Sequence, residues 1–113
     1  MSRPFATPSN WRELGMRCHR WWMHKMRIEI GTQEERSFLI MGLTGELGEL
    51  ANYMKKEWRD GFDPGRRLNI LRELADVQGY LNHLAASYGE DLDQLTADKT
   101  NELIERWPEA FDG

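Results

Sequence analysis

The chain has 113 residues, a mass of 13.3 kDa, 40% apolar and 30% charged side chains, and a net charge of -4. These values are typical of one globular domain, and we expect residues 1–113 to form it. The single cysteine, Cys18, excludes an internal disulfide framework and a thiolate metal cluster. Neither an apolar run long enough to span a membrane nor a secretory signal is present, so a cytoplasmic protein is expected.

The charge is distributed unevenly along the chain. Residues 1–27 contain six Lys or Arg and one acid, which is a net charge of +5, whereas the remaining 86 residues carry -9. Two interpretations are open. The basic segment is either a helix with a solvated cationic face, or a surface that attracts phosphates on a nucleotide or a nucleic acid.

The first helix is expected over residues 11–30. It follows an irregular lead-in, residues 1–10, in which Ser9 or Asn10 can cap the helix. We expect Gly31 to end it, because glycine is the usual residue after a helix C-terminus.

The second helix begins after Thr32, which forms a capping-box pattern with Glu35, and runs to about Asp60. Residues 61–65 are rich in helix breakers and predict a turn, after which a third helix covers residues 66–88.

Gly89 is expected to end the third helix. Asp91 or Asp93 can cap a fourth helix that runs to Trp107, and Pro108 stops it. No stretch alternates between apolar and polar residues over the length of a strand. The sequence therefore predicts an all-α fold of four helices.

The second and third helices each carry an apolar stripe at helical spacing. These stripes are Leu39, Leu43, Leu47, Leu50 and Met54, and Ile70, Leu74, Val77, Leu81 and Leu84. The turn between the two helices is short, which requires an antiparallel pair. We therefore expect a central helical hairpin with facing stripes inside a four-helix bundle.

Four acids accompany these stripes. Each of them directly precedes a stripe residue, so all four lie at the same rotational offset from their stripe. When two antiparallel helices pack with their stripes facing, side chains at equal offsets lie on the same edge of the pair. We therefore expect four acids on one edge: Glu46, Glu49, Glu73 and Asp76. One interpretation is that they are ordinary flanking residues paired with Lys and Arg. The other is a site for a hard divalent cation, Mg²⁺ with Mn²⁺ as an alternative, because such ions prefer oxygen ligands.

The acids also carry a family resemblance. Residues 45–51, Gly-Glu-Leu-Gly-Glu-Leu-Ala, and residues 73–77, Glu-Leu-Ala-Asp-Val, resemble the E-x-x-E and E-x-x-D motifs of the MazG-like all-α nucleoside triphosphate pyrophosphatases. The resemblance covers about residues 33–107, and 23 residues separate Glu49 from Glu73.

The resemblance implies a MazG-like bundle that cleaves a nucleoside triphosphate, often a deoxynucleotide, to the monophosphate and pyrophosphate in nucleotide-pool sanitation or control. It implies that the four acids bind Mg²⁺ and that one E-x-x-E acid, here assigned to Glu49, activates water. It also implies a homo-oligomer, a dimer or a tetramer, whose pocket a neighbouring subunit often completes.

Further residues are expected to bind the substrate. The resemblance implies phosphate, base or sugar contacts for Lys55, Lys56, Tyr80, Lys99, Asn101 and Arg106. The first helix matches the family too loosely to align. The candidate substrate-binding residues of this helix are suggested by side-chain chemistry alone, and they are Trp21, Trp22 and His24. For the two tryptophans, a place in the core or in a subunit contact is favoured over a base contact.

Two other functions remain open. One is a non-catalytic helical protein that binds nucleic acid through the basic, Trp-rich first helix, although nucleic acid is not the favoured partner. The other is a metal-binding relative that has lost hydrolysis. No membrane partner is expected.

Overall fold

The computed structural model describes residues 2–113, which form four α-helices and contain no strand. The helices are α1 (Trp11–Lys25), α2 (Gln33–Asp60), α3 (Pro64–Ser87) and α4 (Leu92–Arg106), followed by a short 3-10 helix (Pro108–Phe111). The predicted all-α class with four helices is confirmed. Among residues 2–113, no helix is long and apolar enough to cross a membrane.

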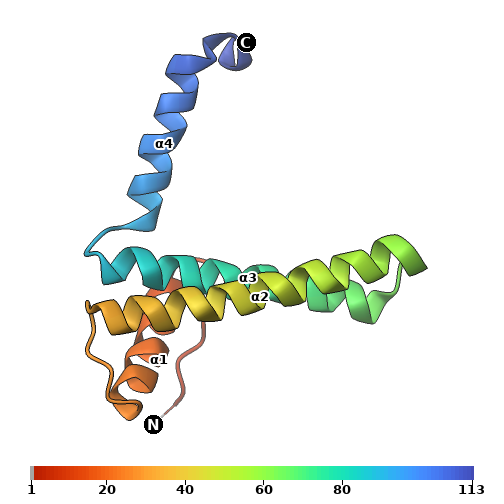
Figure 1. Cartoon of the computed structure of the whole chain (residues 1–113). Coiled ribbons are helices and arrows are strands. Elements are labelled where there is room, and N and C mark those ends of the chain that lie inside the picture. The colour runs from red at the N-terminus through yellow and green to blue at the C-terminus, as the bar shows by residue number, and fades with distance from the viewer. Residues whose placement is uncertain (1) are drawn as a thin grey trace.

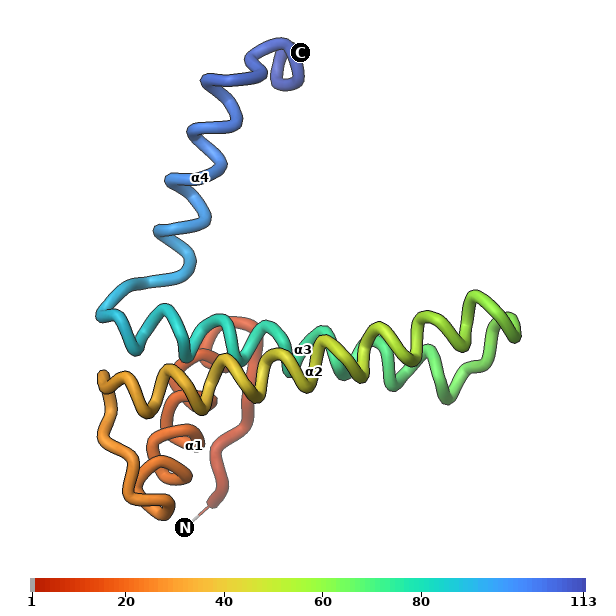
Figure 2. The backbone as a smooth tube through the Cα atoms, in the orientation of Figure 1, coloured from red at the N-terminus to blue at the C-terminus, as the bar shows by residue number. Residues whose placement is uncertain are grey.

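The two longest helices, α2 and α3, lie antiparallel and side by side along most of their length (Figure 1). α1 packs against one side of this pair. α4 leaves the other side and packs mainly on the end of α3 nearest to it (Figures 1 and 2). An ion pair of 2.9 Å between Arg12 and Asp93 links α1 to the start of α4.

The first helix ends at Lys25 and not at Ile30, so its predicted boundary is wrong. Arg27 has the left-handed φ of 58°, and its N–H and that of Ile28 donate to the carbonyls of His24 and Met23. This arrangement ends the helix, and the left-handed position in it is normally occupied by glycine. Because arginine occupies the left-handed position, the usual sequence signal for a helix end is absent.

The other helix ends agree with the capping patterns to within two residues. Thr32 accepts from the N–H of Glu35 at the start of α2, and Asp91 caps α4. α3 starts two residues earlier than predicted, because Asp63 caps it and Pro64 occupies the first position, where its missing N–H costs nothing. α3 ends at Ser87, with Gly89 at a φ of 75° beyond its last turn.

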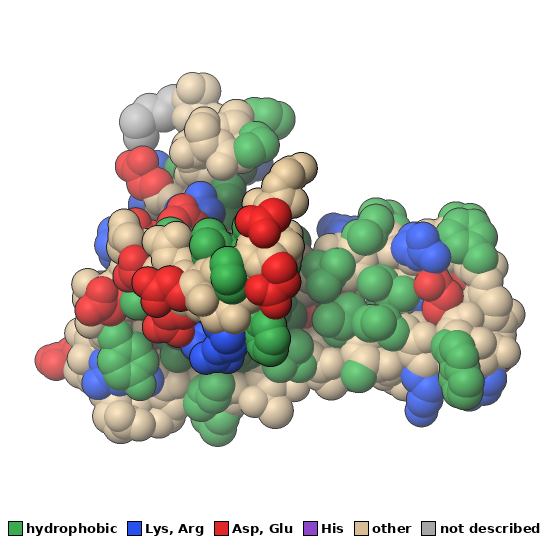
Figure 3. Space-filling model, turned by 90° about the horizontal axis from the view of Figure 1, so that it is seen from above, with side chains coloured by type: hydrophobic (Ala, Val, Ile, Leu, Met, Phe, Trp, Pro, Cys, Tyr) green, Lys and Arg blue, Asp and Glu red, His purple; other side chains and the backbone are tan. Residues whose placement is uncertain are grey.

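The apolar core is small and lies where α1 meets α2 and α3. Its buried apolar residues are Met23, Leu39, Leu43, Ile70 and Ala85. The apolar stripes continue toward the far end of α2 and α3, but there Leu47, Met54 and Leu74 are about half exposed, at 46%, 54% and 49%. Figure 3 shows apolar side chains gathered on that part of the surface.

The chain is also more extended than a compact domain. Its radius of gyration is 17.4 Å, whereas about 13 Å is expected for a domain of this length. Its accessible surface is 8858 Å², roughly 2,400 Å² more than a compact monomer of this mass exposes. Much apolar surface is therefore left unpaired within one chain.

A buried polar contact fixes α1 on α2. The Nε2 of His19 lies 2.6 Å from the carboxylate of Glu35, and both side chains are almost fully buried. The other carboxylate oxygen of Glu35 accepts from the N–H of Gly31 at 2.8 Å. Glu35 therefore does not reach back to the N–H of Thr32 as a capping-box residue would, and instead ties the α1–α2 loop and α1 to the start of α2.

We predict that Glu35→Ala lowers the free energy of unfolding by about 1–3 kcal/mol, because it removes one partner of a buried polar pair and leaves His19 unpaired. Glu34→Ala is the matched control. Glu34 is the exposed neighbour, and its loss should change stability by less than about 0.5 kcal/mol. Chemical denaturation measures both values, and equal stabilities of the two variants would contradict the assigned role.

Candidate functional site

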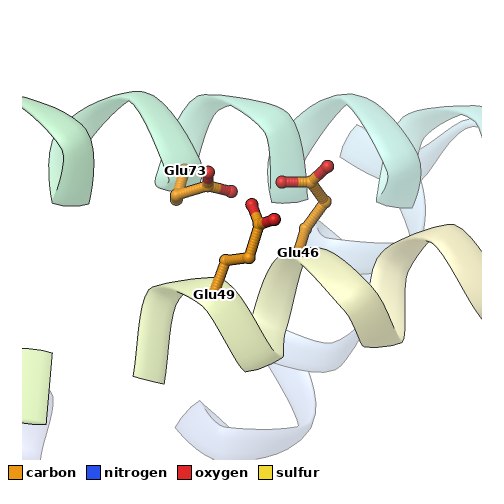
Figure 4. A group of neighbouring side chains, drawn as sticks. All are labelled: Glu46, Glu49 and Glu73. Atoms are coloured by element: carbon orange, nitrogen blue, oxygen red, sulfur yellow. The ribbon is translucent and has the colours of Figure 1, made fainter. Parts of the chain in front are cut away.

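Three carboxylates meet between α2 and α3. Glu46 and Glu49 lie one turn apart on α2 and point toward Glu73 on α3 (Figure 4). Each of the three offers an oxygen, and these oxygens all lie within 4.8 Å of one another. We refer to Glu46, Glu49 and Glu73 as the acidic cluster.

No cation among the described residues compensates the acidic cluster. Within residues 2–113, no Lys or Arg forms an ion pair with any of its three members. One oxygen each of Glu46 and Glu73 is buried and lacks a hydrogen-bond partner. Such atoms are uncommon in folded proteins, because leaving a buried acceptor unpaired costs free energy.

Crowding of like charges changes the acidity of the cluster. The pKa of Glu73 is raised above its usual value mainly because the Glu46 carboxyl lies against it, and burial and the charges of Glu46 and Asp76 act in the same direction. The pKa of Glu49 is raised by its contact with Glu73 and by the charge of that residue. Glu46 thus makes Glu73 harder to ionise, and Glu73 makes Glu49 harder to ionise, whereas the contact with Glu49 partly offsets the rise at Glu73.

Asp76 lies one turn beyond Glu73 on α3 but outside the acidic cluster. It is exposed, and its charge contributes to the raised pKa values of Glu73 and Tyr80. Three of the four predicted metal ligands thus come together, and the fourth borders the cavity next to them.

That cavity has a volume of about 550 Å³ and opens between α1 and α3, with one residue from α2. We refer to it as the aromatic cavity. Its walls are mainly aromatic and apolar, and the residues that line it include His19, Trp22, Phe38, Asp76, Tyr80 and His83.

Tyr80 reaches its place in the cavity because α2 carries a glycine opposite it. A Cβ atom on Gly42 would lie only 2.5 Å from the Tyr80 ring. Burial and the negative charges of Glu46 and Asp76 raise the pKa of Tyr80. Its hydroxyl group therefore stays protonated and can donate a hydrogen bond.

The imidazoles of His19 and His83 stack at 4.5 Å with an angle of 14° between their planes. Burial, and then the neighbouring His19, lower the pKa of His83 to about 4. His83 is therefore neutral near pH 7, and the cavity has an uncharged aromatic wall. A flat ring system suits such walls better than an aliphatic or strongly charged ligand does.

The predicted substrate-binding residues are separated by the fold. Trp22 and Tyr80 line the aromatic cavity, whereas Trp21 and His24 line a different groove on the other side of α1. Lys55 and Lys56 follow the acidic cluster along α2, Lys55 exposed and Lys56 partly buried.

The remaining candidates lie on α4, which projects away from the acidic cluster within one chain (Figure 1): Lys99, Asn101 and Arg106. Lys99 forms a 2.8 Å ion pair with Glu102 on the same helix.

Sequence reasoning missed two of the cavity residues, His19 and Phe38, and placed a third, His83, on the helix face of Asp76 without assigning it to a site. A signal for the α1 wall was present, because Gly15, His19, Trp22 and Met26 recur at spacings of four, three and four. The signal is ambiguous from sequence alone, since the same spacing also describes a helix face that packs in a core.

The acidic cluster fits a divalent cation. All its donors are carboxylate oxygens, which hard ions such as Mg²⁺ and Mn²⁺ prefer, and two of these oxygens have no partner in the protein. The fold and site together define an all-α protein with a carboxylate centre between two antiparallel helices and an aromatic cavity beside it.

Comparison with known proteins gives two relatives, whereas no family model matches. The chain is 37% identical over 76 residues to Gene 37 protein of Mycobacterium phage L5, which covers 65% of this chain and 67% of that protein. The chain belongs to the same family as this phage protein. It is also 35% identical over 77 residues, 62% of its length, to dCTP pyrophosphatase 1 of Mus musculus, but spans only 44% of that enzyme.

The raised pKa values of Glu49 and Glu73 predict how the stability of the metal-free protein depends on pH. A carboxyl whose pKa in the folded state lies above its ordinary value of 4.5 favours folding below that pH, and this contribution is lost as the pH rises through the raised pKa. Glu73→Gln removes one charge of the cluster. It should therefore raise the melting temperature in EDTA more at pH 7.5 than at pH 4.5.

The difference between variant and wild type is the quantity to measure, because His83 acts in the opposite sense. Its pKa is lowered from 6.5 to about 4, so it destabilises the fold as the pH falls below 6.5 in both proteins. A Glu73→Gln protein that is less stable than wild type at pH 7.5 would show that Glu73 is needed for the fold itself.

Proposed function

We propose that the chain is a metal-dependent nucleoside triphosphate pyrophosphohydrolase, which converts a (d)NTP and water to the (d)NMP and pyrophosphate. The observation that carries the proposal is the acidic cluster with its two unpaired buried oxygens, placed directly beside an aromatic cavity. The similarity to dCTP pyrophosphatase 1 and the resemblance to the MazG-like family support the same chemistry.

Glu46, Glu49 and Glu73 would hold Mg²⁺, with Asp76 as a fourth ligand from the cavity side. When bound, the cation would neutralise the charge on the phosphate oxygens of the substrate. The same requirement for oxygen ligands makes Mn²⁺ a suitable replacement.

Glu49 is our candidate for the general base. It is the exposed member of the acidic cluster, so water reaches it more readily than it reaches Glu46 or Glu73. A water molecule that gives its proton to Glu49 can attack the α-phosphorus. The bond between that phosphorus and the oxygen bridging to the β-phosphate then breaks, and pyrophosphate leaves.

The aromatic cavity would hold the nucleobase. Trp22 and Tyr80 offer stacking surfaces, and the neutral imidazole of His83 keeps positive charge out of this wall. Asp76 lines the cavity and lies one turn from Glu73, so a nucleotide with its base in the cavity would direct its phosphates toward the acidic cluster. Lys55 and Lys56 are the nearest candidates along α2 for the phosphate tail.

Pyrophosphate release tests the proposal. With Mg²⁺ or Mn²⁺ and a panel of canonical and modified nucleotides, we expect release that EDTA abolishes. Glu49→Gln and Asp76→Asn should each lower kcat by about 100-fold or more, the usual effect of losing a general base or an equivalent charge.

The control is Glu105→Gln, an exposed acid on α4 that should leave the rate unchanged. If no nucleotide in the panel releases pyrophosphate although calorimetry detects metal binding, the chain is a metal-binding relative without hydrolysis. If neither is detected, the proposal fails.

We also propose that the chain functions as a homo-oligomer. α4 buries none of its residues within one chain, and its exposed apolar side chains include Leu95, Leu103 and Ile104. The far ends of α2 and α3 expose a matching apolar surface (Figure 3). A typical stable interface buries about 800 Å² on each partner, which the surplus surface of this chain exceeds.

Such an assembly gives α4 a place to contribute Lys99, Asn101 and Arg106 to a neighbouring site. Analytical ultracentrifugation should find a dimer or a tetramer. Leu103→Asp should lower the mass to that of a monomer, because it places a charge on the apolar face of α4. Glu109→Asp, an exposed substitution in the 3-10 helix, is the control and should leave the assembly intact. A monomeric wild type at micromolar concentration would refute this part of the proposal.

A further inference from the structure

α1 carries a second chemically distinct face, on the side away from the aromatic cavity. Arg17, Arg20, Trp21 and His24 recur at i, i+3, i+4 and i+7 and are all exposed. This spacing places them on one face of the helix, whereas the buried His19 and Met23 lie on the opposite face. We refer to these four residues as the cationic stripe.

The cationic stripe lines an open groove of about 670 Å³, together with Pro4, Leu14 and Cys18. A second groove continues it beyond the end of α1 and adds Arg27 to Arg20 and His24. The two grooves share Arg20 and His24, so positive groups border both of them, along α1 and into the loop that follows it.

The arginines of this surface form no ion pair within the described residues, although one acid, Glu29, lines the second groove. Across residues 2–113, the ion pairs of arginine involve Arg12, Arg59 and Arg67, whereas Arg17, Arg20 and Arg27 form none. Unpaired cations gathered on one face of a protein whose net charge is -4 create a local positive field that attracts polyanions.

The cationic stripe also contains an exposed aromatic side chain, Trp21. Trp21 is 52% exposed, and the Nζ of Lys25 lies 4.8 Å from the centre of its ring. A half-exposed tryptophan flanked by arginines is the combination with which proteins hold single-stranded nucleic acid, because the arginines contact phosphates and the indole stacks on a base.

Within one chain, the cationic stripe faces away from the acidic cluster. The cluster lies between α2 and α3, and α1 presents to those helices the face that contains His19 and Met23. Trp22 belongs to the aromatic cavity, whereas its neighbour Trp21 belongs to the groove. Within one chain, the positive face of α1 is therefore open to a ligand other than the nucleotide at the acidic cluster.

We propose that the cationic stripe binds single-stranded nucleic acid, with phosphates against Arg17, Arg20 and Arg27 and one base stacked on Trp21. The stripe spans seven helical steps, or about 10 Å, which suits a contact with two or three nucleotides. Single strands fit better than a duplex does, because in a duplex both faces of each base are already stacked.

Fluorescence anisotropy of the full-length protein with a labelled single-stranded DNA 15-mer and its RNA counterpart tests the proposal. We expect binding that weakens as salt rises. Trp21→Ala should weaken it at least about fivefold, the loss expected for one stacked base. Arg20→Ala should reduce the slope of log affinity against log salt by about 0.7.

Two controls separate this site from general attraction and from the acidic cluster. Arg72→Ala removes the same charge from the exposed side of α3 and should change affinity much less than Arg20→Ala does. Glu73→Gln should leave nucleic-acid binding intact while it abolishes metal-dependent turnover. Circular dichroism melting confirms that each variant is folded.

Three results would overturn the proposal: no salt-dependent binding of either single strand, equal or tighter binding of a duplex of the same length, or equal losses from Arg20→Ala and Arg72→Ala. None of them bears on pyrophosphate release, so the proposed enzymatic function stands or falls separately.

Discussion

The antiparallel contact between α2 and α3 places Glu73 opposite Glu46 and Glu49, and most of the chemistry of this chain depends on that contact. It brings three carboxylates to within 4.8 Å of one another and leaves two of their oxygens without a partner. The apolar residues Leu39, Leu43 and Ile70 stabilise the contact and hold these charges together against their mutual repulsion. A divalent cation, if bound as proposed, would relieve the same repulsion and so would stabilise the contact.

The same pair of helices supports the aromatic cavity. Gly42 on α2 leaves room for the Tyr80 ring of α3, and the buried pair of His19 and Glu35 holds α1 as the remaining wall. Carboxylate oxygens and aromatic rings thus lie next to each other, with Asp76 on the border between them. A nucleotide has the matching division into a charged tail and a flat ring, which is why we favour it over other phosphorylated ligands.

The shape of the chain gives its two ends different roles. α1 completes the core and presents a basic face outward, whereas α4 contributes nothing to the core and exposes an apolar stripe. An oligomer would bury the latter. The basic face instead contains unpaired arginines around Trp21, which favours an anionic ligand over a subunit contact. The uneven charge of the sequence therefore corresponds to two surfaces, one acidic between α2 and α3 and one basic on α1.

The sequence by itself determined what depends on neighbours within a turn or two of helix. Hydrophobic periodicity predicted four helices, and Thr32, Asp91 and Gly89 marked helix ends through local hydrogen bonds and backbone conformation. The spacing of Glu46 and Glu49 is likewise a local property, since residues three apart on a helix always share a face.

Only the tertiary structure decided the contacts between distant residues. It joined Glu35 to His19, seated Tyr80 against Gly42, and divided Trp21 from Trp22 between two different surfaces. Each of these depends on the angle and the rotation at which one helix packs on another, which many side chains set together and no local pattern records. The same holds for α4, whose periodicity predicts a helix but does not say which surface that helix will cover.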